Sequence, residues 1–352
     1  KISLHFNQIP DAKTRTVYDN QNNRNAGLPG MGPVRTEGQG ATGNADVDRA
    51  YDYAGDTYDF YKSRHNRDSI DGAGLPIIST VRYCPPNLSQ GCPYENAFWN
   101  GAQMVYGAGY AAADDVVGHE LTHGVTDYES QLFYYMQSGA LNESMSDIWG
   151  EFIDLTNGKG TDGAGVRWLM GEDVPGGGAI RNMANPPAFN DPDRVGSSKY
   201  WCSLDDNGGV HINSGVPNKA TYLMTDGGTF NGKTVTGLGL EKVVRIWYRM
   251  AVNTLVSGAE FQDVYDLLPQ ACMDMAAAGA AGVTPADCQE VRDALDATQM
   301  NAQPVSCAST EAPVCAAGEE AQVVYNEDFE NQGVTFGRWQ SAALQGPNPW
   351  YY

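Results

Sequence analysis

Hydrophobic and polar positions alternate in the first part of the chain and follow helical spacing in the second. Strand-like alternation occurs in KISLHF, TRTVYD, IISTVRY, NAFWNG and QMVYG, all within residues 1–44 and 76–110. Gly and Pro separate these stretches, which predicts short strands joined by loops. Between them, apolar and aromatic side chains recur at helical spacing over residues 46–67, which predicts one long helix.

Beyond residue 110 the apolar positions keep to one stripe, as in amphipathic helices. Helices are predicted at residues 114–128, 138–158, 213–228, 239–255, 261–276 and 285–300. The pattern therefore predicts an α+β protein with a β-rich N-terminal lobe over residues 1–128 and a mainly α-helical C-terminal lobe over residues 129–301. The helix at 114–128 ends the first lobe, so we expect it to lie between the two lobes.

Residues 302–352 differ in composition from both lobes. A stretch rich in Pro, Ala, Ser, Thr and Glu follows Asn301, and residues 322–339 then alternate like the opening strands of a β module. A complete β-sandwich needs about 100 residues. We therefore expect a linker followed by the start of a truncated accessory module or by a tail.

The chain of 352 residues carries 43 acidic and 22 basic side chains, a formal net charge of -21. This charge repels nucleic acid and acidic membrane surfaces, and it favours solubility and cation binding. No apolar run reaches the roughly 18 residues that a membrane-spanning helix needs. Residues 1–10 lack the charged start and apolar core of a signal peptide, so we expect that any export signal has been removed or was never present.

Six of the seven cysteines form pairs with short separations along the sequence. The pairs are Cys84 with Cys92, Cys272 with Cys288, and Cys307 with Cys315. We expect three local disulfides, which indicate an oxidising compartment. Metal binding is the competing interpretation, but no C-x-x-C pair is present. Cys202 is left over, either as a buried thiol or with a partner elsewhere in the fold.

The most specific motif is the pentapeptide from His119 to His123, His-Glu-Leu-Thr-His, in a stretch without proline. Histidines at i and i+4 project from one helix face, close enough for both imidazoles to bind one zinc ion. Glu120 lies beside that face, where its carboxylate can act on a zinc-bound water. A surface helix that carries the pentapeptide by chance is the alternative. Zinc also needs a third protein ligand, and Glu143 lies on the next predicted helix, twenty residues after His123.

Asn142, Glu143 and Asp147 form a second motif, Asn-Glu followed by Asp four residues after the Glu. Together the two motifs resemble the thermolysin-like family of zinc metalloproteases, and the resemblance covers about residues 46–300. It implies a two-lobed fold with the zinc helix between the lobes and Glu143 as the third zinc ligand. It also implies that the Asp147 carboxylate orients the ligand His119.

Two further matches to the family imply the remaining catalytic side chains: the segment DNGGVHINSG at 206–215, and Tyr134, eleven residues after His123. His211 is implied to stabilise the oxyanion that forms during peptide hydrolysis, Asp206 to orient His211, and Tyr134 to be a second, phenolic donor. The resemblance also implies that Glu120 takes a proton from the zinc-bound water and gives it to the leaving amine.

The same resemblance implies where a peptide substrate binds. Asn96 and Ala97 match a strand that pairs with an extended substrate, and Arg181 matches a residue that bonds the carbonyl beyond the cleaved bond. The positions that match the family's primary side-chain pocket are Val116, Met170, Val174 and Ile180. These apolar residues imply cleavage on the amino side of bulky hydrophobic residues such as Leu or Phe.

Four acidic residues match, or lie near, the family's double calcium site: Asp115, Asp154, Glu172 and, more loosely, Asp162. Arg167 and Leu169 stand where the double-site enzymes have acidic residues, and the segment 173–181 is shorter than theirs. Fewer carboxylates favour one hard cation over two. We therefore expect one structural Ca²⁺ at this cluster and the loss of a loop site after Asp173.

Two other functions compete with a zinc endopeptidase. A zinc aminopeptidase shares the ligand pattern, but the Gly-x-Met-Glu-Asn element that would hold a free amine is absent. A purely structural zinc site needs a fourth protein ligand and has no use for Glu120. The resemblance therefore implies a secreted, monomeric endopeptidase that acts on protein or peptide substrates. It also implies inhibition by the enzyme's own propeptide, and residues 1–19 resemble the junction with it.

Overall fold

The computed structural model describes residues 13–304 and residue 307, except residue 177. The chain divides into two compact units, Lys1–Cys307 and Ala308–Tyr352, and all described residues belong to the first unit. The expected strand at KISLHF and the expected β module at 322–339 lie outside the described residues.

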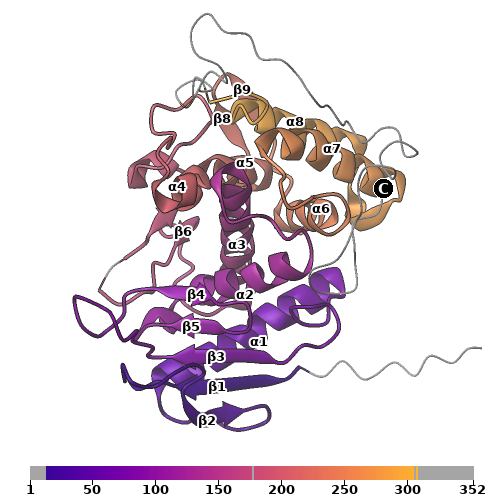
Figure 1. Cartoon of the computed structure of the whole chain (residues 1–352). Helices are drawn as coiled ribbons and strands as arrows, with labels where there is room; N and C mark the ends of the chain where they lie inside the picture. Colours follow the sequence, from indigo (N-terminus) through magenta and orange to yellow (C-terminus); the bar gives the residue numbers. More distant parts are fainter. Residues whose placement is uncertain (1–12, 177, 305–306, 308–352) are drawn as a thin grey trace, which may run out of the picture. The chain divides into compact units, whose positions relative to one another are not determined.

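A five-stranded sheet forms the N-terminal part of this unit (Figure 1). Its strands are β1 (Arg15–Asp19), β2 (Met31–Thr36), β3 (Ile77–Val81), β4 (Ala97–Trp99) and β5 (Met104–Tyr106). Their order is β2-β1-β3-β5-β4, with β3 parallel to both β1 and β5. Strands β2 and β4 pair antiparallel at the two edges. One edge of β4 is therefore left without a partner strand among the described residues.

Helix α1 (Ala45–His65) contacts strands β1 and β3 of the sheet. Its first turn is capped by the Asn44 side chain, which accepts a hydrogen bond from the Asp46 backbone N–H. The apolar and aromatic stripe expected from the sequence is the buried face of this helix. The buried residues of the stripe are Val47, Ala50, Tyr51, Ala54, Tyr58 and Tyr61. The sequence therefore predicted both this helix and the face that it buries.

The C-terminal part of the unit is mainly helical, as expected. Helix α2 (Asp114–Tyr128) precedes this part, whose helices are α3 (Met136–Asn157), α4 (Asp205–Asn213), α5 (Gly215–Asp226), α6 (Leu240–Asn253), α7 (Phe261–Ala277) and α8 (Pro285–Ala297). Helix α4 was not predicted, and its residues 206–209 are left-handed. In Figure 1, α2 and α3 lie between the sheet and the helices α6, α7 and α8. The α+β class and the two-part arrangement are thus confirmed, whereas the exact lobe boundaries stay a prediction. No helix in the described part of the chain is both long enough and apolar enough to cross a bilayer.

The structure also contains short elements that the sequence analysis did not predict. Two small hairpins pair β6 (Leu169–Met170) with β7 (Arg181–Asn182), and β8 (Gly228–Phe230) with β9 (Lys233–Val235). Three 3₁₀ turns occupy Tyr110–Ala112, Pro186–Phe189 and Ala280–Gly282. Strands of two or three residues are too short for an alternating pattern to show.

Helices α2 and α3 approach each other closely because glycines lie at their contact. A Cβ atom built on Gly118 would lie 3.1 Å from the Cα of Gly150, and one built on Gly150 would lie 2.6 Å from the Asp115 carbonyl oxygen. Larger residues at either position would push the helices apart. This contact holds the face of α2 that bears the two motif histidines against α3.

The disulfides agree with the sequence prediction in two of three cases. Cys84 pairs with Cys92, and Cys272 pairs with Cys288. The predicted Cys307–Cys315 pair is wrong, because Cys307 pairs with Cys202, at a Cα–Cα distance of 5.0 Å and a separation of 105 residues. Short spacing identified the local pairs, but it gives no sign of two segments that meet only through tertiary folding.

Candidate active site

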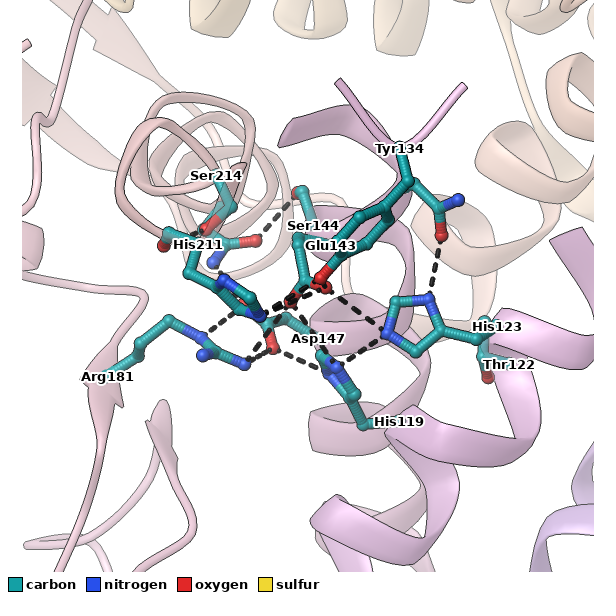
Figure 2. A network of polar contacts seen from close by, with 12 residues as sticks. His119, Thr122, His123, Tyr134, Glu143, Ser144, Asp147, Arg181, His211 and Ser214 are labelled. Atoms are coloured by element: carbon teal, nitrogen blue, oxygen red, sulfur yellow. Dashed lines mark hydrogen bonds and ion pairs between the residues drawn. The ribbon is translucent and has the colours of Figure 1, made fainter. Parts of the chain in front are cut away.

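His119 and His123 lie one turn apart on α2, and Glu143 faces them from α3 (Figure 2). The two Nε2 atoms are 3.0 Å apart. Glu143 Oε2 lies 3.5 Å from His119 Nε2, and Glu143 Oε1 lies 3.3 Å from His123 Nε2. Donors that each lie about 2.1 Å from a tetrahedral zinc ion are about 3.4 Å apart, so these three side chains fit one zinc ion.

Further polar contacts fix the orientation of each of these side chains. His119 Nδ1 lies 2.9 Å from Asp147 Oδ1, and His123 Nδ1 lies 2.8 Å from Asn142 Oδ1. Each ring therefore turns its Nε2 atom toward Glu143. Glu143 is fully buried, and its Oε2 atom has no hydrogen-bond partner among the described residues. A buried carboxylate oxygen without a donor favours a cation at this point.

The charges of the site favour a cation as well. Burial lowers the pKa of His123, but the Glu143 carboxylate outweighs this effect and raises that pKa to about 9. Burial raises the pKa of Asp147, but Arg181 and His119 outweigh it and lower that pKa to about 2. Arg181 makes two hydrogen bonds to Asp147, at 2.8 and 2.5 Å. The imidazoles thus lie in a negative field, which is the environment a divalent metal requires.

His211 and Tyr134 approach the Glu143 carboxylate from the side away from His119 and His123 (Figure 2). His211 Nε2 lies 3.0 Å from the Tyr134 hydroxyl and 3.4 Å from Glu143 Oε1, and Tyr134 donates to Glu143 Oε1. Asp206 accepts from the His211 backbone N–H at 2.9 Å, and its Oδ1 lies 2.6 Å from His211 Nδ1. The resemblance had assigned these three residues to one site, and the structure brings them together beside the metal-binding trio.

Glu120, His119 and His123 border a cleft of about 430 Å³. Glu120 is 6% exposed, and burial raises the pKa of its carboxyl group. The free-edged strand β4 forms one wall of the cleft, because Asn96, Ala97, Phe98 and Trp99 all line it. A carboxylate thus lies next to the candidate metal position and within reach of a molecule in the cleft.

The predicted substrate-binding residues are mostly found in this cleft. Asn96, Ala97, Val116, Met170, Ile180 and Arg181 line it. Val174 does not line it, although it was expected to; its side chain is buried at 7% exposure in the hydrophobic core. Ile180, by contrast, packs over Gly171 and lines the cleft. Of the four expected pocket residues, Val116, Met170 and Ile180 therefore contribute to the apolar lining of the cleft, together with Leu132 and the side chains of β4.

The expected calcium ligands gather at the first turn of α2 and the last turns of α3. Asp115 and Asp154 are 1% and 2% exposed, and Asp162 is close enough to hydrogen-bond to Asp154. Burial and repulsion from neighbouring carboxylates raise the pKa of Asp154 to about 11 and that of Glu172 to about 7. Within the described residues, only the His119, His123 and Glu143 trio has its ligand atoms all within 4.8 Å of one another, so these carboxylates are less tightly grouped.

Two carboxylates of this acidic cluster were missed by the sequence analysis, Asp114 and Glu151. Glu151 accepts a hydrogen bond from the Trp168 backbone N–H at 2.6 Å, and its other oxygen is buried without a partner in the described part of the chain. A signal for Glu151 was present in the sequence. It lies four residues after Asp147 and three before Asp154, on the helix face that bears Glu143.

The contacts of Asn142 and Asn218 were also missed. Asn142 bonds to His123, as described above, and Asn218 on α5 donates to Asp147 Oδ2 at 2.8 Å. The adjacency of Asn142 to Glu143 was the only sign of the first contact. Nothing in the sequence indicated the second, because Asn218 is far from Asp147 along the chain.

Two family models match the chain. The thermolysin metallopeptidase catalytic domain matches residues 7–127, and the thermolysin metallopeptidase alpha-helical domain matches residues 130–300. A zinc metalloproteinase of Renibacterium salmoninarum is 40% identical over 282 residues, which are 75% of this chain and 51% of that protein. A thermolysin of Alicyclobacillus acidocaldarius subsp. acidocaldarius is 44% identical over 264 residues, 72% of this chain and 45% of that protein.

Among solved structures, the precursor of protealysin, a metalloproteinase from Serratia proteamaculans, is similar with a TM-score of 0.65 and 35% sequence identity. The match covers 82% of this chain and 88% of that one. This chain spans about half the length of the curated relatives that it matches. Sequence and structure comparisons agree across both parts of the described unit, and we conclude that this chain belongs to the thermolysin metallopeptidase family.

Proposed function

We propose that the chain is a secreted, zinc-dependent endopeptidase that hydrolyses peptide bonds on the amino side of bulky hydrophobic residues. One observation carries this proposal: a metal-binding trio with three protein donors opens onto a cleft that also contains a carboxylate, Glu120. A structural zinc site is normally closed by a fourth protein ligand, whereas a catalytic one keeps a position free. All three side chains of the trio line the cleft, so a zinc ion bound to them would be open to a molecule in the cleft.

The side chains around the trio support a general acid–base mechanism. Zinc, when bound, supplies a Lewis acid that lowers the pKa of water and polarises a carbonyl group. Glu120 accepts a proton from the attacking water and then delivers it to the amine that leaves. His211 and Tyr134, whose polar atoms are 3.0 Å apart, donate to the oxygen that becomes negative as the carbonyl is attacked. Asp206 holds the His211 ring in the required orientation.

An extended peptide suits the shape of the cleft. The free edge of β4 offers backbone hydrogen bonds to a peptide that adds as a further strand. Arg181, partly buried beside the trio, can donate to a substrate carbonyl while it remains bound to Asp147. Val116, Met170 and Ile180 offer an apolar surface for the side chain that follows the cleaved bond. This surface favours Leu or Phe at that position and disfavours charged residues.

The test is hydrolysis of an internally quenched peptide with Gly-Leu at its centre. Wild type is compared with Glu120→Gln, each with and without a zinc chelator, and the products are identified by mass spectrometry. We expect cleavage before Leu only by the untreated wild type, and a kcat at least about 100-fold lower for Glu120→Gln with its zinc retained. A Glu120→Gln protein of normal activity would refute the assignment of the base. Release of only the terminal residue would indicate an exopeptidase.

Two features support secretion and an inhibitory propeptide. Three disulfides are typical of proteins that fold in an oxidising compartment. The protealysin structure is described as a precursor, and we extend this to the present chain. Isolation of the protein from culture medium, with its N-terminal sequence determined, tests both ideas. Recovery only from the cytoplasm, with reduced cysteines, would contradict them.

One structural Ca²⁺ at the acidic cluster completes the proposal. Asp154 Oδ1, Glu172 Oε2 and Glu151 Oε2 are buried without hydrogen-bond partners among the described residues. Carboxylate oxygens are the ligands that Ca²⁺ prefers. Arg167 stands where the double-site enzymes have an acidic residue, and its guanidinium group pairs with Asp226 at 2.7 Å. Metal analysis should find one calcium per chain, and two or more would count against this assignment.

A further inference from the structure

The turn before His211 has an unusual backbone. Asp206, Asn207, Gly208 and Gly209 all have left-handed conformations, with φ values of 54°, 50°, 87° and 80°. For the two residues with side chains, this conformation costs about 1–2 kcal/mol each relative to ordinary backbone. A run of four such residues does not hold its shape by itself. Asp206, whose carboxylate contacts His211 Nδ1, belongs to this turn, so the direction of the His211 ring depends on what packs against the turn.

Trp201 supplies much of that packing. Its backbone N–H donates to Asn213 Oδ1 at 2.9 Å, and its carbonyl oxygen accepts from Asn213 Nδ2 at 3.0 Å. Its side chain lies so close to Gly209 that a Cβ atom built there would be 2.6 Å from Trp201 Cδ1. Trp201 thus contacts the chain on both sides of His211, through Gly209 before it and Asn213 after it.

The residue after Trp201 is Cys202, which forms a disulfide with Cys307. Cys307 lies ten residues beyond the end of α8 and is partly buried against the hydrophobic core, in which the end of α8 is also fixed. Thr298 and Met300 are fully buried, and the Thr298 carbonyl accepts from the Val195 backbone N–H at 3.0 Å. The disulfide therefore connects the Trp201 segment to a residue that packs against the core. Without it, Trp201 and Cys202 would depend on noncovalent contacts alone.

We infer that the Cys202–Cys307 disulfide is a positioning element for the reaction, holding Trp201 against the left-handed turn so that His211 points at the metal centre. The inference rests on the proposed endopeptidase function. The inference gives this disulfide a role that the Cys272–Cys288 disulfide, which joins α7 to α8, does not have. Both disulfides restrict the unfolded chain, but only Cys202 lies within ten residues of a side chain of the active site.

The kinetic test compares the double variant Cys202→Ser/Cys307→Ser with the matched control Cys272→Ser/Cys288→Ser, both loaded with zinc. Because His211 acts on the oxyanion rather than on the bound substrate, its misplacement should lower kcat and leave KM nearly unchanged. We expect kcat to fall at least about tenfold in the first variant and less than about twofold in the control, with the zinc content unchanged. Equal kcat values in the two variants would overturn the inference.

Combining the disulfide variant with a His211 variant distinguishes a positioning role from a general loss of stability, because the effects of the two changes on kcat should not add. In a His211→Ala background, removal of the Cys202–Cys307 disulfide should cause almost no further loss of kcat, because the group that it positions is already absent. A further tenfold loss in that background would overturn the inference. If the double serine variant does not fold, Trp201→Leu with the disulfide intact replaces it, and the same fall in kcat is expected.

Two further measurements do not depend on peptidase activity. Peptide mapping of the wild type should find Cys202 linked to Cys307, and a Cys307–Cys315 link would overturn the inference. Hydrogen exchange should become faster over residues 201–213 in Cys202→Ser/Cys307→Ser and stay unchanged there in Cys272→Ser/Cys288→Ser. Unchanged exchange in the first variant would also overturn it. If the wild type cleaves no peptide, the proposed function fails while these two measurements still decide the inference.

Discussion

Replacing His65 with phenylalanine should make the protein more resistant to acid. His65 is the last residue of α1, and its ring stacks on Tyr248 with a centroid distance of 3.8 Å and an interplanar angle of 13°. Its Nε2 atom is buried without a hydrogen-bond partner among the described residues. Burial, together with the positive charges of Arg245 and Arg64, lowers the pKa of His65 from 6.5 to about 3.

The magnitude follows from proton linkage. Because the pKa of this histidine is lower in the folded state, the unfolded chain binds a proton below pH 6.5 while the folded chain does not. The free energy of unfolding therefore falls by about 1.4 kcal/mol for each pH unit below that value. At about pH 5 the loss is about 2 kcal/mol, and at about pH 7.5 it is below about 0.1 kcal/mol. Phenylalanine removes this loss and keeps an aromatic ring against Tyr248.

The assay is urea unfolding followed by tryptophan fluorescence at about pH 7.5 and about pH 5, with all proteins carrying Glu120→Gln to prevent self-digestion. The quantity compared is the difference in free energy of unfolding between His65→Phe and the parent at each pH. The other titrating groups are the same in both proteins, so their contributions to the free energy of unfolding cancel in this difference. We expect this difference to shift by about 2 kcal/mol in favour of His65→Phe between the higher and the lower pH.

Phe60→Leu is the matched control, because Phe60 contacts the His65 ring but does not titrate. Its effect on the free energy of unfolding should be the same at both pH values. A His65→Phe difference that stays constant between the two pH values, within about 0.5 kcal/mol, would refute the reasoning. Such a result would mean that His65 gains its proton in the folded protein at an ordinary pKa.

The contacts of the His119, His123 and Glu143 trio, of the core and of the acidic cluster each lead to one more expected outcome. Asn142→Ala removes the partner of His123 Nδ1 and should weaken zinc binding about 10- to 100-fold, measured by competition with a fluorescent chelator; unchanged affinity would show that this contact does not orient the ring. Leu121→Ala creates a cavity at a side chain that is 1% exposed and should lower the free energy of unfolding by about 2–5 kcal/mol in urea; a loss below about 1 kcal/mol would contradict the close packing of α2. Glu151→Gln keeps the size of the side chain but removes its charge, and it should raise the Ca²⁺ concentration needed for full thermal stability; an unchanged calcium dependence would exclude Glu151 as a ligand.

Local sequence was sufficient for the elements whose cause is local. The stripe from Val47 to Tyr61 predicted α1 and its buried face, because a helix buries whichever side carries its apolar residues. The spacing of His119 and His123 likewise placed both imidazoles on one side of α2, since the helical repeat alone determines that direction. The disulfides Cys84–Cys92 and Cys272–Cys288 close short loops, and their spacing was enough to identify them.

The third candidate metal ligand could not be identified from local pattern alone. Glu143 lies on a different helix, and nothing in the periodicity of either helix states which residues of α3 face α2. Its assignment came from the resemblance of the motif to a known family, and the structure supplies the physical cause. Gly118 and Gly150 allow the two helices to approach closely enough for the carboxylate to reach both imidazoles.

Tertiary structure alone decided the rest. Two of the remaining features join segments that are far apart in sequence, namely the Cys202–Cys307 disulfide and the contact of Asn218 with Asp147. The third is the inward position of Val174, which results from packing of the surrounding core. Such contacts form because many segments pack together at once, and their free energy depends on neighbours that no local window of sequence contains. The sequence thus determined the zinc-binding helix and the chemistry of its donors, while the folded chain determined which distant side chains orient them.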